Sequence, residues 1–270
     1  MRYEIDGLNV TKLFRESHFP AGEKNITISP WDTPEDKEQE VFFVDKCSGH
    51  LHLMSIGMKV DILRRTGFKR ISLVLPYLPY ARQDRYTVPG ASFALKVAAK
   101  FINSLDLERV YVVDAHSDVS GVIDNLWDMP IHSIVNDVLF EHPDIVNVIA
   151  PDAGAAKKIY TLMSNFAAKK NIVVATKHRD PATGDINGIS VPDVEGPCLV
   201  IDDICDGGRT FTELAKVMNN EKKYLYVTHG IFSKEDVFNS YDAVWTTDTT
   251  KHIPMQANVI PVDWGQKQRR

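Results

Sequence analysis

Short apolar runs alternate with longer segments of helical periodicity along the chain. Runs of the length expected for buried strands lie at residues 41–44, 71–75, 109–113, 145–149, 172–175, 199–201, 224–230, 243–247 and 258–262. Segments with apolar residues at helical spacing lie at residues 50–65, 92–103, 131–141 and 211–218. This alternation predicts an α/β fold with parallel sheets flanked by helices. Residues 1–40 are polar and predict little regular structure beyond a short strand at 25–28.

The sharpest change of pattern lies between residues 199 and 218, which read LVIDDICDGGRTFTELAKVM. Three apolar residues lead to two adjacent acids, and a further acid, a glycine pair, an arginine and a threonine follow. We predict a strand that ends before Asp202, then a loop, then a helix. The apolar face of that helix comprises Phe211, Leu214, Ala215 and Met218.

The predicted loop has the residues of a phosphate-binding site. Ligands of open α/β sheets bind beyond the carboxyl ends of strands, and glycines leave backbone N–H groups uncovered there. A helix that begins after the loop directs its first N–H groups and its positive dipole end at an anion. The carboxylates of Asp202 and Asp203 suit the hydroxyls of a neighbouring diol, or a metal ion held by them, so the pattern indicates ribose 5-phosphate. An ordinary turn with solvated acids is the alternative.

Composition and charge narrow the class of protein. The chain has 270 residues, enough for two domains, and 44% of them are hydrophobic and 25% charged. The formal net charge of −5 argues against general nucleic-acid binding, and no apolar run is long enough to span a bilayer. The three cysteines have no metal-site spacing, and the first residues lack a signal-peptide core. We therefore expect a cytoplasmic protein with reduced thiols and with neither nucleic-acid nor membrane partners.

Residues 76–85 read PYLPYARQDR and form a second polar segment after a predicted strand. The prolines exclude regular structure. Tyrosine, arginine and glutamine side chains offer stacking, phosphate charge and hydrogen bonds to a purine edge, which suits a nucleotide. A surface loop with a salt bridge is the alternative.

Other chemically active side chains directly follow predicted strands. Asp114 and His116 could bind Mg²⁺ directly or through water. Asp152 lies in a glycine-bearing turn, and Lys177 and Arg179 begin a polar stretch. A lone histidine is more often structural, and basic residues two apart are more often surface charge, so these residues alone do not decide a function.

Two of these segments resemble a known family. VIDDICDGGRT resembles the phosphoribosyl-pyrophosphate (PRPP) binding loop that type I phosphoribosyltransferases share with ribose-phosphate pyrophosphokinases, also called PRPP synthases. PYLPYARQDR is similar to a signature of the PRPP synthases that the transferases lack. The resemblance extends over about residues 18–262.

The resemblance implies a fold and a reaction. It implies two similar domains of the type I phosphoribosyltransferase-like fold, residues 1–130 with an ATP site and residues 131–270 with the ribose 5-phosphate loop, and an active site between them. The implied enzyme is a ribose-phosphate diphosphokinase, which transfers pyrophosphate from ATP to the C1 hydroxyl of ribose 5-phosphate and gives PRPP and AMP. Mg²⁺ is the implied cofactor, and the implied assembly is a homo-oligomer with an ATP site shared between subunits.

The resemblance also implies roles for individual residues. The implied catalytic residues are Lys177 and Arg179. The implied ATP-binding residues are Phe19, Gly22, Glu23, Arg82, Gln83, Asp84 and His116. The implied ribose 5-phosphate-binding residues are Asp202, Asp203, Asp206, Gly207, Gly208, Arg209 and Thr210. The implied metal ligands are Asp114, His116 and Asp152. The departures from the family pattern are Ala21 in place of an acid, and Ala155 and Arg209 in place of glycines.

Two other functions stay open on the sequence. A phosphoribosyltransferase would consume PRPP and need no ATP, and the segment 76–85 argues against it. A non-catalytic protein that associates with a PRPP synthase would usually lack the basic catalytic residues or the acidic loop, and this chain keeps both.

Overall fold

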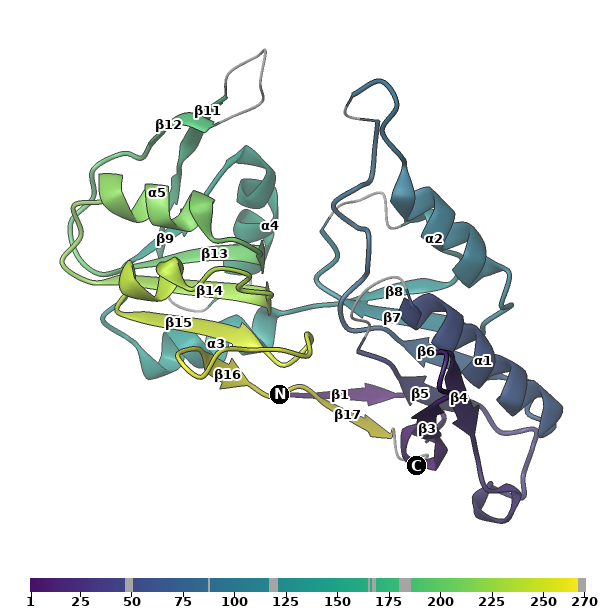
Figure 1. Ribbon diagram of the computed structural model, residues 1–270. Helices are drawn as coiled ribbons and strands as arrows, with labels where there is room; N and C mark the ends of the chain where they lie inside the picture. Colours follow the sequence, from purple (N-terminus) through teal and green to yellow (C-terminus); the bar gives the residue numbers. More distant parts are fainter. Residues whose placement is uncertain are drawn as a thin grey trace. The chain divides into compact units, whose positions relative to one another are not determined.

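The computed structural model of the chain describes residues 1–46, 51–86, 88–116, 121–164, 166, 169–179 and 186–266. The chain divides into two compact units. The N-terminal unit comprises Arg2–Met129 together with Val262–Arg270, and the C-terminal unit comprises Pro130–Pro261 together with Met1 (Figure 1). None of the helices in the described residues has the length and apolar character needed to span a bilayer.

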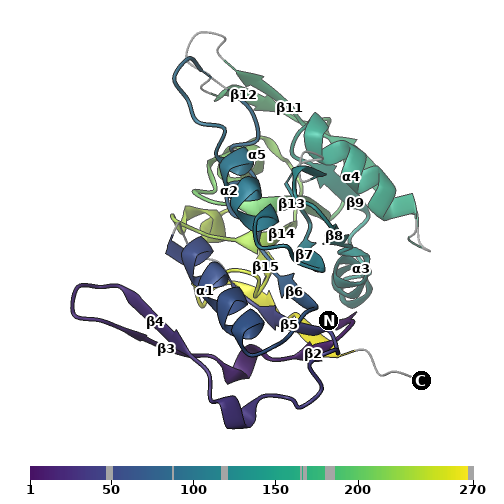
Figure 2. The same cartoon turned by 90° about the vertical axis from the view of Figure 1, so that its right-hand side faces the viewer.

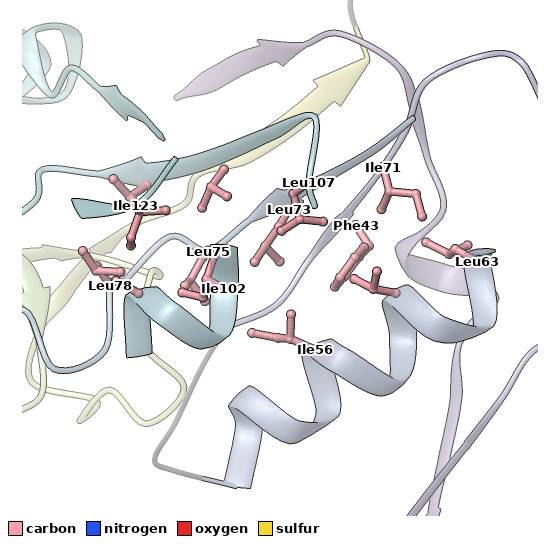
Figure 3. Packing of buried hydrophobic residues seen from close by; sticks show 14 of the residues in the cluster. Phe43, Ile56, Leu63, Ile71, Leu73, Leu75, Leu78, Ile102, Leu107 and Ile123 are labelled. Carbon is pink, nitrogen blue, oxygen red and sulfur yellow. The ribbon is translucent and has the colours of Figure 1, made fainter. Parts of the chain in front are cut away.

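A five-stranded parallel sheet forms the centre of the N-terminal unit. Its strands in spatial order are β2 (Leu8–Asn9), β5 (Val41–Val44), β6 (Ile71–Val74), β7 (Arg109–Val113) and β8 (Leu126–Met129). Helices α1 (Leu51–Arg65) and α2 (Ala94–Asn103) pack on this sheet. Alternate strand residues and both helices share one apolar core, seen in Figure 3, which includes Phe43, Ile56, Leu63, Leu73 and Ile102.

The first and last described strands pair with each other within the N-terminal unit. β1 (Arg2–Ile5) runs parallel to β17 (Asp263–Gln266), and Tyr3 stacks on Trp264 with 5.1 Å between ring centroids. The sequence assigns residues 262–266 to the second domain, whereas the structure places them in the N-terminal unit. Local periodicity cannot reveal this pairing because the partners come from opposite ends of the described chain.

Residues 1–40 contain more regular structure than their polar pattern predicts. Besides β1 and β2, β3 (Arg15–His18) and β4 (Lys24–Thr27) form an antiparallel hairpin (Figure 2). The Phe19 N–H donates to the Glu23 carbonyl at 2.8 Å, and the Gly22 N–H donates to the Phe19 carbonyl at 2.8 Å, which closes the turn. Gly22 has φ +90°, a left-handed conformation that favours glycine.

A six-stranded parallel sheet forms the centre of the C-terminal unit. Its strands in spatial order are β10 (Asn171–Val174), β9 (Asn147–Ala150), β13 (Cys198–Cys205), β14 (Lys223–Gly230), β15 (Ala243–Thr247) and β16 (Asn258–Ile260). The helices of this unit are α3 (His132–Glu141), α4 (Ala153–Ser164) and α5 (Arg209–Val217). A hairpin consists of β11 (Thr176–Arg179) and β12 (Ile186–Ser190). Short 3₁₀ helices are η1 (Thr11–Leu13), η2 (Pro30–Asp32) and η4 (Asp236–Asn239).

Strand β13 is longer than the sequence predicts. The prediction that it ends before Asp202 is wrong, because both adjacent acids lie within the strand, which continues to Cys205. β14 is equally long and pairs with β13 as far as Cys205 and Gly230, so the polar positions keep a strand partner. The predicted burial of Phe211, Leu214, Ala215 and Met218 is confirmed, but α5 ends at Val217, so Met218 is buried directly after the helix.

The N-terminal core gives a direct test of the fold. Leu73 is fully buried in β6, so Leu73→Ala should lower the free energy of unfolding by about 2–5 kcal/mol, as large-to-small core substitutions do. Val97 on α2 is 66% exposed, and Val97→Ala is the matched control that should change little. Urea denaturation followed by circular dichroism measures both variants, and equal stability of the two would contradict the core.

Candidate functional site

The loop between β13 and α5 contains the glycine pair on which the predicted phosphate site depends. Gly208 has φ +70°, and a Cβ atom there would lie 3.1 Å from Cβ of Val237, so both conformation and space favour glycine. Helix α5 begins at Arg209 with Gly208 as its N-cap residue, and among the described residues no side-chain hydrogen bond caps it. The uncapped N–H groups and the positive end of the helix dipole favour an anion at this loop.

The residues that directly follow strand β14 hold the same loop in place. The Ser233 hydroxyl donates to Oδ1 of Asp206 at 2.8 Å, and the Ser233 N–H donates to the Asp206 carbonyl at 3.0 Å. The Phe232 N–H donates to the Cys205 carbonyl at 3.1 Å. Ser233 therefore holds the orientation of Asp206. Sequence reasoning missed this serine because only the pairing of β13 with β14 brings it to the loop.

Asp202 and Asp203 form an acidic pair at the end of β13. Asp203 is 6% exposed, and the Nζ of Lys158 lies 3.7 Å from its Oδ2. The Asp203 N–H donates to Oδ1 of Asp202 at 3.0 Å. Burial, and next the Asp203 carboxylate, raise the pKa of Asp202 to about 8. The pair therefore carries less negative charge at neutral pH than two carboxylates in water, and a bound cation would favour its full ionisation.

Asp152 and Lys177 form an ion pair beside these acids. The Nζ of Lys177 lies 2.7 Å from Oδ2 of Asp152, and the Ala155 N–H donates to Oδ1 at 3.0 Å. Burial acts to raise the pKa of Asp152, but Lys177 and the N–H groups of Ala155 and Gly154 outweigh it and lower the pKa. Asp152 and Lys177 also act electrostatically on Asp202, so the C-terminal unit brings these three charges together.

The hairpin β11–β12 places Lys177 in regular structure, although the sequence suggests a polar loop there. Lys177 pairs with Ile189, and its side chain is 11% exposed. The backbone of Arg179 ends β11, but the Arg179 side chain lies outside the part of the chain that the structure describes. The structure therefore brings Lys177 into the described charge cluster, and the role of Arg179 stays a prediction.

The segment 76–85 presents three exposed polar side chains, Arg82, Gln83 and Arg85, and one buried acid. Arg82 and Gln83 are exposed, and the Leu95 N–H donates to the Gln83 carbonyl at 3.2 Å, which ties the segment to α2. Asp84 is 7% exposed and accepts two hydrogen bonds of 2.8 Å from Arg85. Asp84 therefore supports the segment, and Arg82 and Gln83 are accessible to a ligand.

Asp114 and His116 follow β7. Asp114 is 5% exposed with φ +50°, which is uncommon for a residue other than glycine, and His116 is exposed. The Ala115 N–H donates to the Asp128 carboxylate at 3.2 Å and fixes the turn. Sequence reasoning missed Asp128, which lies on the neighbouring strand β8.

The donor set suits Mg²⁺ better than a metal enclosed by protein ligands. No group of three or more histidines, cysteines or acids that could hold a metal ion occurs among the described residues. Mg²⁺ is usually bound through one or two carboxylates, water and substrate phosphates. The carboxyl groups of Asp202 and Asp203 fit that mode of binding, in which the ion would displace the proton that the raised pKa of Asp202 favours.

The hairpin β3–β4 presents the remaining candidate residues. Phe19 at its turn is 53% exposed, and Glu23 is also exposed. Nothing lies within 4 Å of a Cβ atom built on Gly22, so the turn is open to solvent. An exposed aromatic ring beside a carboxylate could contact a flat, hydrogen-bonding ligand.

A family model and curated relatives identify the same protein family. A family model described as the N-terminal domain of ribose phosphate pyrophosphokinase matches residues 8–106. A curated ribose-phosphate pyrophosphokinase of Agrobacterium fabrum is 32% identical over 209 residues, which cover 72% of this chain and 66% of that protein. One of Shewanella oneidensis is 30% identical over 225 residues, which cover 78% of this chain and 70% of that protein. The chain thus spans about two thirds of the length of these relatives.

The structural comparison agrees on the fold. The crystal structure of phosphoribosylpyrophosphate synthetase from Mycobacterium smegmatis matches with a TM-score of 0.75 and 21% sequence identity. The match covers 92% of this chain and 85% of that chain. The two-sheet α/β architecture is therefore that of a known enzyme fold.

The raised pKa of Asp202 predicts a pH dependence of stability in the metal-free protein. Because the folded-state pKa lies above the ordinary value of 3.8, the stabilising contribution is present below that value and is lost as the pH rises through about 8. Without metal, the melting temperature should fall more steeply from pH 5 to 9 in wild type than in Asp202→Asn. Glu213→Gln, at an exposed position of α5, is the control and should follow wild type. Parallel melting curves for wild type and Asp202→Asn would contradict the pKa.

Proposed function

The chain belongs to the ribose-phosphate pyrophosphokinase family, and from this we propose that it is itself a ribose-phosphate diphosphokinase. In the proposed reaction the C1 hydroxyl oxygen of ribose 5-phosphate attacks the β-phosphorus of ATP. The bond from that phosphorus to the oxygen shared with the α-phosphorus breaks, AMP leaves with this oxygen, and the hydroxyl proton passes to solvent. The products are PRPP and AMP.

The loop from Asp206 to Thr210 is the observation that carries the proposal. Its uncapped N–H groups at the start of α5 would bind the 5-phosphate, and Asp202 and Asp203 would bind the ribose hydroxyls. Arg209 is exposed at the first position of the helix, where its charge would add to that of the dipole. Gly207 and Gly208 would let the backbone approach the phosphate closely.

Lys177 would stabilise the negative charge that develops on the transferred group. Such a reaction needs positioning and charge neutralisation more than covalent catalysis. The ion pair with Asp152 at 2.7 Å keeps the ammonium group ordered near the acidic pair. We assign Arg179 a similar role on the family resemblance. In the N-terminal unit Asp114 and His116, and in the C-terminal unit Asp152, would each bind Mg²⁺, which would neutralise phosphate charge when bound.

ATP would be bound by residues of the N-terminal unit. Arg82 and Gln83 are exposed, and Asp84 holds their segment through Arg85. Phe19, Gly22 and Glu23 form the turn of the β3–β4 hairpin and would contact the adenine. We further propose a homo-oligomer in which this turn serves the ATP site of a second copy. The family model matched over residues 8–106 favours this reaction over that of a PRPP-consuming transferase.

The reaction is tested by ³¹P NMR of the purified protein with ribose 5-phosphate, ATP and Mg²⁺. Equal growth of AMP and PRPP signals is the expected result. Consumption of PRPP with a free base, and no AMP in the first mixture, would identify a transferase instead. No reaction in either mixture would indicate a non-catalytic protein that associates with a PRPP synthase.

Substitution of Lys177 tests its role. Lys177→Ala should lower the turnover number by about 100-fold or more, the scale of losing one preorganised donor to a developing charge. The matched control is Lys216→Ala, because the Lys216 side chain is 68% exposed on α5 and forms a surface ion pair with Glu213. An unchanged turnover number in Lys177→Ala would refute the role.

A further inference from the structure

Lys59 is a buried cation that joins three elements of the N-terminal unit. It lies on α1 and is 7% exposed. Its Nζ lies 2.7 Å from Oδ2 of Asp45, directly after β5, and 2.7 Å from Oε1 of Glu16 on β3. Asp45 is 4% exposed, so the centre of this cluster is shielded from water.

The charges in the cluster are balanced. Oε2 of Glu16 accepts a hydrogen bond of 2.9 Å from the Nζ of Lys24, on the opposite strand of the hairpin. Burial acts to lower the pKa of Lys59, but Asp45 and Glu16 outweigh it and raise the pKa. Burial acts to raise the pKa of Glu16, but Lys24 and Lys59 lower it to about 2. Lys59 and Glu16 are therefore both charged at neutral pH.

Glu16 is the point at which this cluster reaches the hairpin. Lys24 and Glu16 belong to the two strands of the same hairpin, so their contact does not orient the hairpin against the rest of the unit. The Lys59–Glu16 contact orients the hairpin against the rest of the unit, because α1 is anchored in the core by Ile56, Val60 and Leu63. Ile26 of β4, which is 6% exposed, adds an apolar contact without the directionality of a charged hydrogen bond.

We propose that Lys59 is a positioning residue for the nucleotide site, because it holds the β3–β4 hairpin against α1 in one orientation. The inference rests on the proposed function, in which Phe19 and Glu23 at the turn of this hairpin contact ATP. Lys59 touches no substrate and acts through Glu16. A buried charge pair often adds little net stability but fixes the relative placement of the elements it joins.

The experiment separates orientation from stability. Spin labels are placed on cysteines at Ala21→Cys in the turn and Met54→Cys on α1, a position that is 63% exposed. Cys47→Ser removes one native thiol, and the other two, Cys198 and Cys205, are buried. Labelled protein is diluted with unlabelled protein so that only distances within one chain are recorded by pulsed electron resonance.

Glu16→Gln is the main variant because it leaves the buried Lys59–Asp45 pair intact. Its label-to-label distance distribution should broaden, and its KM for ATP should rise roughly tenfold, the effect of about 1.4 kcal/mol. Its kcat and melting temperature should stay near those of wild type. Glu38→Gln breaks the exposed Lys69–Glu38 pair of the same unit and is the matched control, expected to change none of these quantities.

The double variant Lys59→Met with Asp45→Asn removes both buried charges together. It should retain a cooperative melting transition and show the same broadening and the same rise in KM as Glu16→Gln. An unchanged distance distribution in both variants overturns the proposal, and so does broadening with an unchanged KM for ATP. Wild-type protein without PRPP synthesis would refute the proposed function instead, and the distance distributions would still report whether Lys59 holds the hairpin.

Discussion

Parallel strand pairing is the constraint on which the candidate site depends. In a parallel sheet the carboxyl ends of all strands lie at the same edge. Residues that are far apart in the sequence therefore meet at that edge. In the C-terminal unit this edge receives Asp152 after β9, the acidic pair of β13, and Ser233 after β14. In the N-terminal unit it receives the segment 76–85 after β6 and Asp114 after β7. The pattern of strand lengths therefore decides which polar groups become neighbours.

Two acids of the C-terminal unit, Asp152 and Asp202, differ in the protonation state that their surroundings favour. Asp152 is stabilised as a carboxylate by Lys177, whereas Asp202 is pushed towards its protonated form by burial and by Asp203. The cluster thus contains one carboxylate, Asp152, that is already paired with a cation, and one acid, Asp202, whose ionised form a bound cation would stabilise. Different groups of such a site bind a divalent ion and a phosphate. The ion would reduce the repulsion between the acids, whereas the phosphate would bind the ammonium group of Lys177 and the N–H groups at the start of α5.

The sequence predicts the local parts of this structure well. The buried face of α5 follows from the spacing of Phe211, Leu214 and Ala215, and the phosphate-type loop follows from the glycine pair. The extent of β13 was missed because Asp202 stays in the strand only through its pairing with β14. Ser233 and Asp128 were missed for the same reason, since each acts across a strand pair. Lys59 gave no signal, because a lysine on a helix is usually solvated.

The pairing of β1 with β17 has a consequence for synthesis of the chain on the ribosome. Residues 130–261 form one continuous unit, but the N-terminal unit is interrupted by them and takes β17 from beyond them. The C-terminal unit can therefore complete its core in the nascent chain while β1 still lacks its partner. The two units would then be completed in the opposite order to the one in which they begin in the sequence, and Tyr3 would stay without its Trp264 contact until β17 has been synthesised.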